Sequence, residues 1–430
     1  MGGIILKSSK IKKIFLILGI LSLAVVFTGC GKKTSASSVK HITYWHVNAQ
    51  TQGGATVDEL VKKFNSTHKN IKVTAKYNPD MYKGLMQNLQ SAQASGKVPD
   101  VVQVGWAYDN YFASNFKYLT PTDAAKNFDG NSKFIDSSFT KKTLSFAKDS
   151  NGKLVGLPYS LSTPVLFINK DILNKYGVQE NSLTTWEGVK EASKRIYDQS
   201  GKYGLYIQEP GDTWAQQAIM LSNGAKIQKN GKADFASSNG VNAYKYYQEM
   251  VSEKLALHTP WAQGIDSFVK GDVAMAFTTI AQASHIKESA SFNAAAIVAP
   301  HFKEYKTVVP VGGSMLAITA QDSEQQKAAW KFEKWMYSAE SAVTWSKGTG
   351  YLPATQAALK SNDFKDYTNA NPMLKPAVKT LDNAVPWTSF PKKGLQAEQT
   401  MIDARDKILS GSDISSTLKA AQDKINAQQE

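Results

Sequence analysis

Carboxylates are the first side chains to weigh, because two of them on either side of a glycosidic bond can hydrolyse a sugar. Asp109, Glu209 and Asp212 could supply such a pair, but nothing in their spacing brings two of them to one bond. The sequence also lacks a Gly-x-Ser-x-Gly elbow, a His-Glu-x-x-His motif and a Walker loop. We therefore expect no catalytic residue, and a secreted carbohydrate-active enzyme is a remote alternative.

Histidines could bind a metal if they came in close pairs, as they do in nitrogen-ligand sites. The six histidines are instead spread singly along the chain, at positions 41, 46, 68, 258, 285 and 301. This pattern is typical of surface or core histidines. We expect no metal and no cofactor, although a metal-capturing lipoprotein is a second alternative.

Cys30 is the single cysteine, and the segment before it is typical of a secretory signal. Four lysines precede an apolar run, Ile14 to Phe27, that is shorter than the roughly 20 residues of a spanning helix. Residues 27–30, Phe-Thr-Gly-Cys, resemble a bacterial lipobox, which implies that Cys30 is acylated, with palmitate for example, and becomes the N-terminus. We interpret 1–29 as a signal peptide and 30–40 as a lipidated N-terminus and flexible tether.

The net charge of +14 arises from 50 basic and 36 acidic side chains, and four of the lysines belong to the signal segment. Arg195 and Arg405 are the only arginines, whereas surfaces that recognise nucleic acids usually depend on arginine. We therefore expect no nucleic-acid partner. A length of 430 residues with 42% hydrophobic and 20% charged residues predicts a soluble protein of two domains.

The first part of the mature chain alternates between two periodicities. Segments 41–47, 71–77 and 101–104 have the composition of buried strands, and segments 57–64 and 82–94 have apolar residues at helical spacing. This alternation predicts an α/β layout with parallel strands and right-handed crossovers.

The remaining chain suggests a second lobe and a return to the first. We expect helices at 186–197, 214–221, 242–253, 324–346 and 396–409, and strands at 165–168, 203–207, 273–277, 294–299 and 312–318. Lobe 1 is then about 41–155 and 294–350, and lobe 2 about 156–293 and 351–430. Several crossings between two lobes favour closure of a hinge over a ligand in the cleft.

Five segments, in this order, carry a resemblance to a known family: 157–171 (LPYSLSTPVLFINKD), 185–187 (TWE), 268–275 (FVKGDVAM), 311–314 (VGGS) and 349–353 (TGYLP). They are similar to the extracellular solute-binding proteins, family 1 type, of carbohydrate ABC importers, and in particular to the glycerol-3-phosphate-binding group. The resemblance implies a two-lobed periplasmic-binding-protein-like α/β fold with hinge crossovers and a ligand cleft between the lobes.

The resemblance also implies where the ligand binds. Hydroxyls, backbone amides of glycines and flat aromatic faces suit a polyhydroxylated ligand. The positions that match the family's ligand-binding residues, together with Trp106 beside them, are Tyr82, Trp106, Ser162, Trp214, Thr278, Thr279, Gly312, Gly313 and Tyr351. Several have structural alternatives: Ser162 could cap a turn, Gly312 and Gly313 could form a bulge, and Trp214 could be core.

Two departures from the glycerol-3-phosphate binders change the expected ligand. Trp106 stands where they carry a glutamate, and their phosphate-binding arginine falls near Glu398. Arg405, Lys392 or Lys393 could still supply positive charge. These exchanges favour a neutral sugar or oligosaccharide, with glycerol-3-phosphate or a glycerophosphodiester as the alternative.

The resemblance therefore predicts a monomeric lipoprotein on the extracellular face of the bacterial cell membrane. We expect it to capture a carbohydrate and deliver it to ABC permease subunits without chemical change. A structural or adhesive surface protein is a third alternative, but repeats or an elongated all-β pattern would then be expected.

Overall fold

The computed structural model describes residues 39–208 and 211–430. Cys30, the signal segment and most of the tether, as well as Glu209, lie outside the described residues. Within the described part of the chain, no helix is both long and apolar enough to cross a membrane. The expectations about lipidation therefore remain predictions.

A six-stranded sheet contains the strands that the sequence predicts at the start of the chain. Strand β1 pairs in parallel with β2 and β3, and β13 pairs antiparallel with β3 and β4. The strand order is β14-β4-β13-β3-β1-β2, with bounds β1 (Lys40–His46), β2 (Ile71–Tyr77), β3 (Val101–Gly105), β4 (Leu157–Ser162), β13 (Gly312–Ile318) and β14 (Leu352–Pro353).

A five-stranded sheet follows, in which β6 pairs in parallel with β9 and β10, and β5 pairs antiparallel with β10 and β11. Its order is β11-β5-β10-β6-β9, with bounds β5 (Pro164–Asn169), β6 (Tyr203–Ile207), β9 (Ala256–Leu257), β10 (Val273–Thr279) and β11 (Ala294–Val298). Two short pairs complete the strands: β7 (Gln228–Lys229) with β8 (Lys232–Ala233), and β12 (Val309–Pro310) with β15 (Ala384–Val385).

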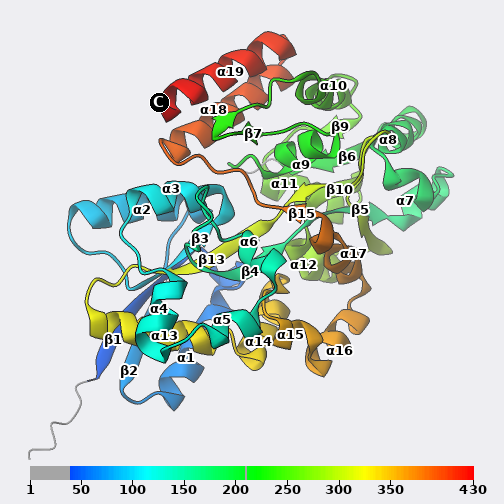
Figure 1. Cartoon of the computed structure of the whole chain (residues 1–430). Coiled ribbons are helices and arrows are strands. Elements are labelled where there is room, and N and C mark those ends of the chain that lie inside the picture. The colour runs from blue at the N-terminus through cyan, green and yellow to red at the C-terminus, as the bar shows by residue number, and fades with distance from the viewer. Residues whose placement is uncertain (1–38, 209–210) are drawn as a thin grey trace, which may run out of the picture. The chain divides into compact units, whose positions relative to one another are not determined.

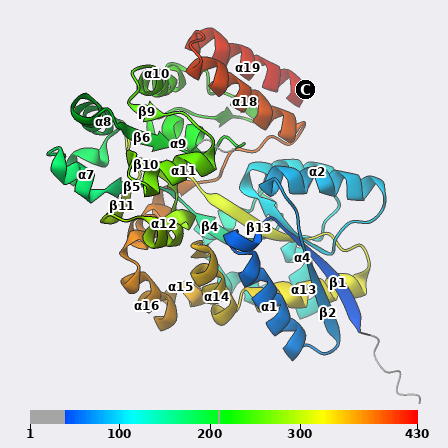
Figure 2. The ribbon, with the colours of Figure 1, turned by 180° about the vertical axis from the view of Figure 1, so that it is seen from behind.

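Helices cover the sheets with their apolar sides. Helix α1 (Gly54–Thr67) buries Val57, Leu60 and Phe64 at helical spacing. Figures 1 and 2 show α2 (Met81–Ala94) on one face of the six-stranded sheet, and α1 and α13 (Ser323–Met336) on the other.

The other α-helices connect strands or cover the sheet faces and edges. They are α3 (Asp109–Asn115), α4 (Pro121–Asp129), α5 (Lys133–Ser138), α6 (Lys141–Ser145), α7 (Lys170–Lys175), α8 (Trp186–Ser200), α9 (Trp214–Ser222), α10 (Ser238–Ser252), α11 (Trp261–Val269), α12 (Ala283–Ser289), α14 (Ala339–Thr349), α15 (Gln356–Lys360), α16 (Asn362–Ala370), α17 (Lys375–Thr380), α18 (Gly394–Leu409) and α19 (Ile414–Gln429).

Two expectations about the later helices are wrong. The single helix expected at 324–346 is two helices, because the Ser338 hydroxyl accepts a hydrogen bond from the Ser341 amide and starts α14. The helix at 396–409 does not close the chain. Gly411, at φ 99°, ends α18, and Asp413 caps the further helix α19.

The chain passes between the two sheets at three places. Thr163 alone separates β4 of the first sheet from β5 of the second, and the chain returns through β12, which precedes β13. It leaves again after α16 toward β15 and α18. The small β12–β15 sheet, in which the Val311 amide donates to Val385 O at 2.8 Å, ties two of these passages together.

Three strands lie in the other sheet from the one that the sequence analysis assigned. Residues 157–162, which it placed in lobe 2, form β4 of the first sheet. Residues 294–298 form β11, which pairs with β5, and residues 352–353 form β14, which pairs with β4. Side-chain pattern identifies a strand but not its partner. Here the chain order misleads because each strand lies next to a passage between sheets.

Candidate functional site

Tyr82 lies against the end of β3 because Gly105 leaves space for its ring. A Cβ atom at Gly105 would come within 2.4 Å of Tyr82 Cγ. The hydroxyl of Tyr82 is buried and interacts with those of Ser314 and Tyr351. Burial also raises its pKa well above the ordinary value, so it stays protonated and can donate.

Three predicted site residues meet at Gly312. Ser162 of β4 is its register partner in the sheet, and a Cβ atom on Gly312 would lie 2.4 Å from Ser162 Oγ and 2.8 Å from the indole of Trp214. Residues from the first sheet and from the start of α9 are therefore in contact here. The glycine is required because any side chain would separate them.

Gly313 is held in a conformation that favours glycine. Its φ is 103°, and a Cβ atom there would come within 2.1 Å of Ser160 O. The register of β13 against β4 shifts one residue later, between Ser314 and Met315. Gly312 and Gly313 therefore lie next to an irregularity in the pairing of β13 with β4, as expected if they form a bulge.

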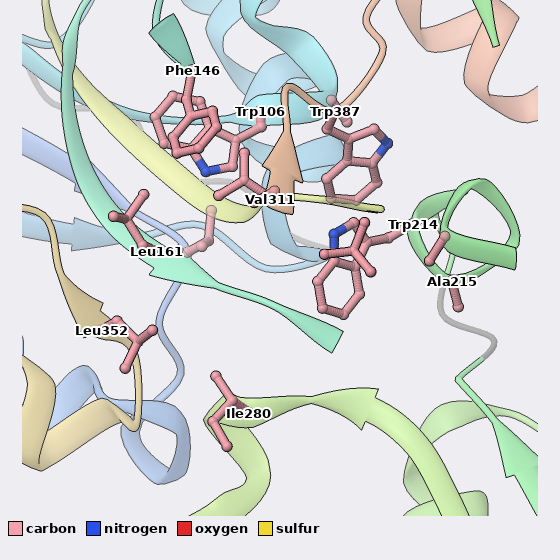
Figure 3. Packing of buried hydrophobic residues seen from close by; sticks show 14 of the residues in the cluster. Trp106, Phe146, Leu161, Trp214, Ala215, Ile280, Val311, Leu352 and Trp387 are labelled. Carbon is pink, nitrogen blue, oxygen red and sulfur yellow. The ribbon is translucent and has the colours of Figure 1, made fainter. Parts of the chain in front are cut away.

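Two of the tryptophans anchor their indole nitrogens on the same segment. Trp106 Nε1 donates to Gly312 O at 3.1 Å, and Trp214 Nε1 donates to Pro310 O at 3.0 Å. Figure 3 shows Trp106 beside Phe146 and Trp214 below Trp387, with Val311 near them. The passage from β12 into β13 therefore holds both aromatic side chains.

Trp387 is a residue that the sequence analysis missed. Its ring lies 6.2 Å from that of Trp214, and its Nε1 donates to Thr213 Oγ1 at 3.2 Å. A tryptophan next to Pro386, in a segment between helices, was the available indication. Periodicity draws attention to helices and strands, whereas Trp387 belongs to neither.

Thr278 and Thr279 end β10, as predicted, but both hydroxyls have structural partners. The Thr278 hydroxyl donates to Gln208 Oε1, and the Thr279 hydroxyl accepts from the Ala281 amide at 3.2 Å. Each hydroxyl can make a further bond. Their role toward a ligand remains a prediction.

Tyr351 follows a glycine that contacts the segment after β10. Its ring stacks on that of Trp345 at a centroid distance of 6.2 Å and an angle of 5°. The preceding Gly350, at φ 74°, packs against Ala281, which follows Thr279 by two residues. The chain before Tyr351 and the end of β10 are therefore in contact.

Two acidic side chains, the buried Glu398 and the half-buried Asp212, lie beside Trp214. Glu398 Oε1 accepts from the Thr213 amide at 2.6 Å, and Asp212 Oδ1 accepts from the Trp214 amide at 3.0 Å. Burial raises the pKa of Glu398 to about 8 and that of Asp212 to about 6, and the charge of Arg405 opposes both shifts. Glu398 and Arg405 are thus close to one another, at a place where negative charge is disfavoured.

Asp109 and Asp212 are the two acids of the possible catalytic pair that lie among the described residues. Burial raises the pKa of Asp109 to about 8, and the carboxylate that adds to this shift is Asp149. Among residues 39–208 and 211–430, no group of three or more histidine, cysteine or acidic side chains is arranged to hold a metal ion.

The predicted site is covered in this structure. Ser162, Trp106 and Trp214 are 2% exposed or less. Two open hollows on the surface, of about 640 and 440 Å³, are lined by Asn131 to Ser137 and by residues around Asp58 and Lys62, none of them a predicted site residue. A ligand can reach Trp214 only if the covering segments move.

Comparison with known proteins supports the architecture described above. The model of the bacterial extracellular solute-binding protein family matches residues 59–372, which is most of the chain. The chain belongs to this family. Its two sheets with their helices are the two lobes of the family's fold.

Relatives and solved structures agree with this assignment. The sn-glycerol-3-phosphate-binding periplasmic protein UgpB of Salmonella typhimurium is 25% identical over 387 residues, covering 85% of each chain. UgpB of Mycobacterium tuberculosis, solved with glycerophosphocholine, has a TM-score of 0.79 at 21% identity and covers 90% of this chain and 97% of its own. The GacH receptor of Streptomyces glaucescens, solved with acarbose, has a TM-score of 0.78 at 22% identity, covering 91% and 99%.

Proposed function

We propose that this protein is the substrate-binding subunit of an ABC importer and that it captures a carbohydrate, a sugar or an oligosaccharide. The observation that supports this most is the meeting of Ser162, Gly312 and Trp214 at the joint between the lobes. A hydroxyl, a side-chain-free backbone and an indole face are suited to the polar edges and the C–H face of a sugar.

We propose that binding works by closure of two lobes. Residues 39–162 and 312–371 form one lobe, and residues 164–298 and 375–430 form the other, with the β12–β15 pair at the hinge. Closure removes water from the ligand, and each polar group left unmatched then costs about 1–3 kcal/mol, which provides discrimination. The ligand leaves unchanged for the permease.

The alternative ligand is glycerol-3-phosphate or a glycerophosphodiester, which the names of the UgpB relatives favour. Glu398 argues against it here, because it stands where the glycerol-3-phosphate binders carry a phosphate-binding arginine, and with its pKa raised to about 8 it provides no positive charge. A carbohydrate-active enzyme is a remoter alternative, and the binding-protein family of the chain argues against it.

The proposed location is the extracellular face of the bacterial cell membrane, with the protein held there as a monomer by lipid on Cys30. The lipobox-like segment supports this location, and more than one acyl chain would be needed for stable anchoring.

Titration of the purified protein tests the function. We expect tryptophan fluorescence and calorimetry to show saturable binding of at least one sugar in a panel of mono- and oligosaccharides, and weak or no binding of glycerol-3-phosphate. Recovery of the bound sugar intact, without new reducing ends, separates a binding protein from an enzyme. Tight binding of glycerol-3-phosphate alone would establish the alternative.

A further inference from the structure

The first lobe meets the second along α3. Gly394, the first residue of α18, packs so closely on this helix that a Cβ atom there would lie 2.6 Å from Tyr111 Cβ. Asn115 Nδ2 donates to Pro391 O at 3.0 Å. Helix α3 therefore lies against the segment that leads into α18 of the second lobe (Figure 1).

An acidic side chain is enclosed in this contact. Asp109 begins α3 and is 2% exposed. The backbone amide and the side-chain amide of Asn110 both donate to Asp109 Oδ1. Ser389, from the segment before α18, interacts through its hydroxyl with the Asp109 carboxyl group and accepts from the Asn110 amide at 3.2 Å. The second lobe thus closes over Asp109.

The charges around Asp109 do not favour its ionised form. The charged group that acts on it is Asp149, in the loop before β4, which is also acidic. Lys392 and Lys393 of the covering segment are exposed, and Lys392 Nζ donates to Glu430 O at 2.6 Å. Burial raises the pKa of Asp109 to about 8, although the hydrogen bonds from Asn110 and Ser389 oppose this shift.

Two further acids face the first lobe at the same contact. Burial, with the charges of Glu398 and Asp212 adding to it, raises the pKa of Tyr108 well above its ordinary value, so these two acids lie close to Tyr108. Arg405 acts on both acids and favours their ionised form. Asp109 has no such cation among the groups that shift its pKa, so it is the acid that closure affects most.

Movement of the second lobe away from α3 would return Asp109 to water. Its pKa would then fall from about 8 toward the ordinary value of 3.8. A group whose pKa is higher in the closed form takes up a proton on closure. Its contribution to closure is full below about pH 4 and is lost as pH rises toward 8.

We propose that the contact between α3 and the segment leading into α18 is a proton-controlled latch. Asp109 is uncharged when the lobes are closed and ionises when they open, so rising pH favours the open form and release of the ligand. Closure itself is part of the proposed function, and its control by pH goes beyond that function.

Small-angle scattering of the purified protein without ligand tests the latch. We expect the radius of gyration of the wild type to increase between pH 6 and pH 8.5, because the lobes separate. Asp109→Asn has nearly the same shape but cannot ionise, so its radius should stay close to the value of the wild type at pH 6.

Calorimetry with a sugar measures the same coupling. The probe is whichever of maltose, trehalose, lactose and raffinose binds most tightly, and titration at pH 7 in phosphate and in Tris gives the number of protons taken up. We expect the wild type to take up about one proton more than Asp109→Asn. Its Kd should rise at least about tenfold between pH 6 and pH 8.5, and that of Asp109→Asn should rise less.

Two control variants separate the latch from general effects of charge and burial. Glu333 is buried in α13, which packs on β1, β13 and α4 of the first lobe, so its protonation should not change on closure. Asp366 is exposed on α16. Glu333→Gln and Asp366→Asn should both keep the dependence of Kd on pH that the wild type shows.

The outcomes distinguish the latch from the proposed ligand. A wild-type radius that is the same at pH 6 and pH 8.5, or one that increases equally in Asp109→Asn, would overturn the latch. Equal proton uptake by the wild type and Asp109→Asn would overturn it too. If no sugar binds, the proposed function fails, whereas scattering still decides whether pH controls closure.

Discussion

Trp214 connects three parts of the molecule through a single side chain. It begins α9, donates to Pro310 O at the hinge, and touches both Gly312 and the ring of Trp387. An indole that is 2% exposed would also be expected in an ordinary core. Its effect on ligand affinity separates the two roles.

Trp214→Ala should weaken sugar binding at least tenfold, about 1.4 kcal/mol, because the ligand loses its stacking face. Trp330→Phe is the control, since Trp330 lies on α13 with its Nε1 bonded to Asp129. Calorimetry measures both. Unchanged affinity in Trp214→Ala, with a folded protein, would show that Trp214 is only a core residue.

Glu333 is a buried acidic side chain in α13. It is 1% exposed, its Oε1 has no hydrogen-bond partner, and burial raises its pKa to about 8. The folded state therefore holds a proton that the unfolded state releases near pH 4.5. Stability from this group is full below about pH 4.5 and is lost as pH rises toward 8.

Between pH 5 and pH 8 the wild type should lose unfolding free energy as Glu333 becomes harder to keep protonated. Glu333→Gln should lose at least about 1 kcal/mol less over the same range. Urea unfolding at the two pH values measures it. Glu288→Gln, an exposed position on α12, should behave as wild type. Parallel pH profiles for wild type and Glu333→Gln would contradict a protonated Glu333.

The family resemblance predicted part of the candidate site. Ser162, Gly312 and Trp214 were predicted from resemblance, and the structure brings these three together. Trp387 could not be predicted in that way, because it lies in a segment without periodicity.

At the scale of elements, β13 determines the geometry of the site. It carries Gly312 and Gly313, pairs with both β3 and β4, and follows directly from the hinge strand β12. The close approach of β4 and α9 to this strand requires that Gly312 have no side chain.

Gly312→Ala should therefore destabilise the protein by about 1–3 kcal/mol and weaken sugar binding more than tenfold. Gly231→Ala provides a destabilised control, because Gly231 has a φ of 78° in the β7–β8 turn, whereas a Cβ atom there would meet no other atom within 4 Å. That control should unfold more easily but keep its affinity. Equal affinity in both variants would remove Gly312 from the site.

The elements themselves were predicted where local pattern determines them. The parallel β1–β3 unit and the helices at α1, α2 and α8 agree with apolar periodicity. The assignment of β4, β11 and β14 to sheets was wrong, since pairing is a long-range property. The break between α13 and α14 depends on a single capping serine, Ser338, within a region of otherwise continuous helical pattern.

At the scale of the whole molecule, a covered site implies movement before binding. Lys83 Nζ of α2 donates to Gln399 Oε1 of α18 at 2.8 Å, which joins helices of the two lobes. The Asn115 amide side chain of α3 also donates to Pro391 O at 3.0 Å. The Asn110 amide donates to Ser389 Oγ at 3.2 Å as well, so separation of the lobes breaks several polar contacts.

Lipidation is a property of the full chain in its cell. Cys30→Ala should move the protein from the membrane fraction to the soluble fraction and abolish labelling with palmitate, because the acyl chains provide the anchor. Fractionation with immunoblotting measures the distribution. Retention of the variant at the membrane would indicate an uncleaved hydrophobic segment instead.

The most direct test of the account is a crystal structure of the protein with the sugar that binds most tightly. We predict the intact sugar between the lobes, with a ring face on Trp214 and hydroxyls on Ser162 and at the Gly312 backbone. A sugar bound outside this joint, or found cleaved within it, would contradict the account.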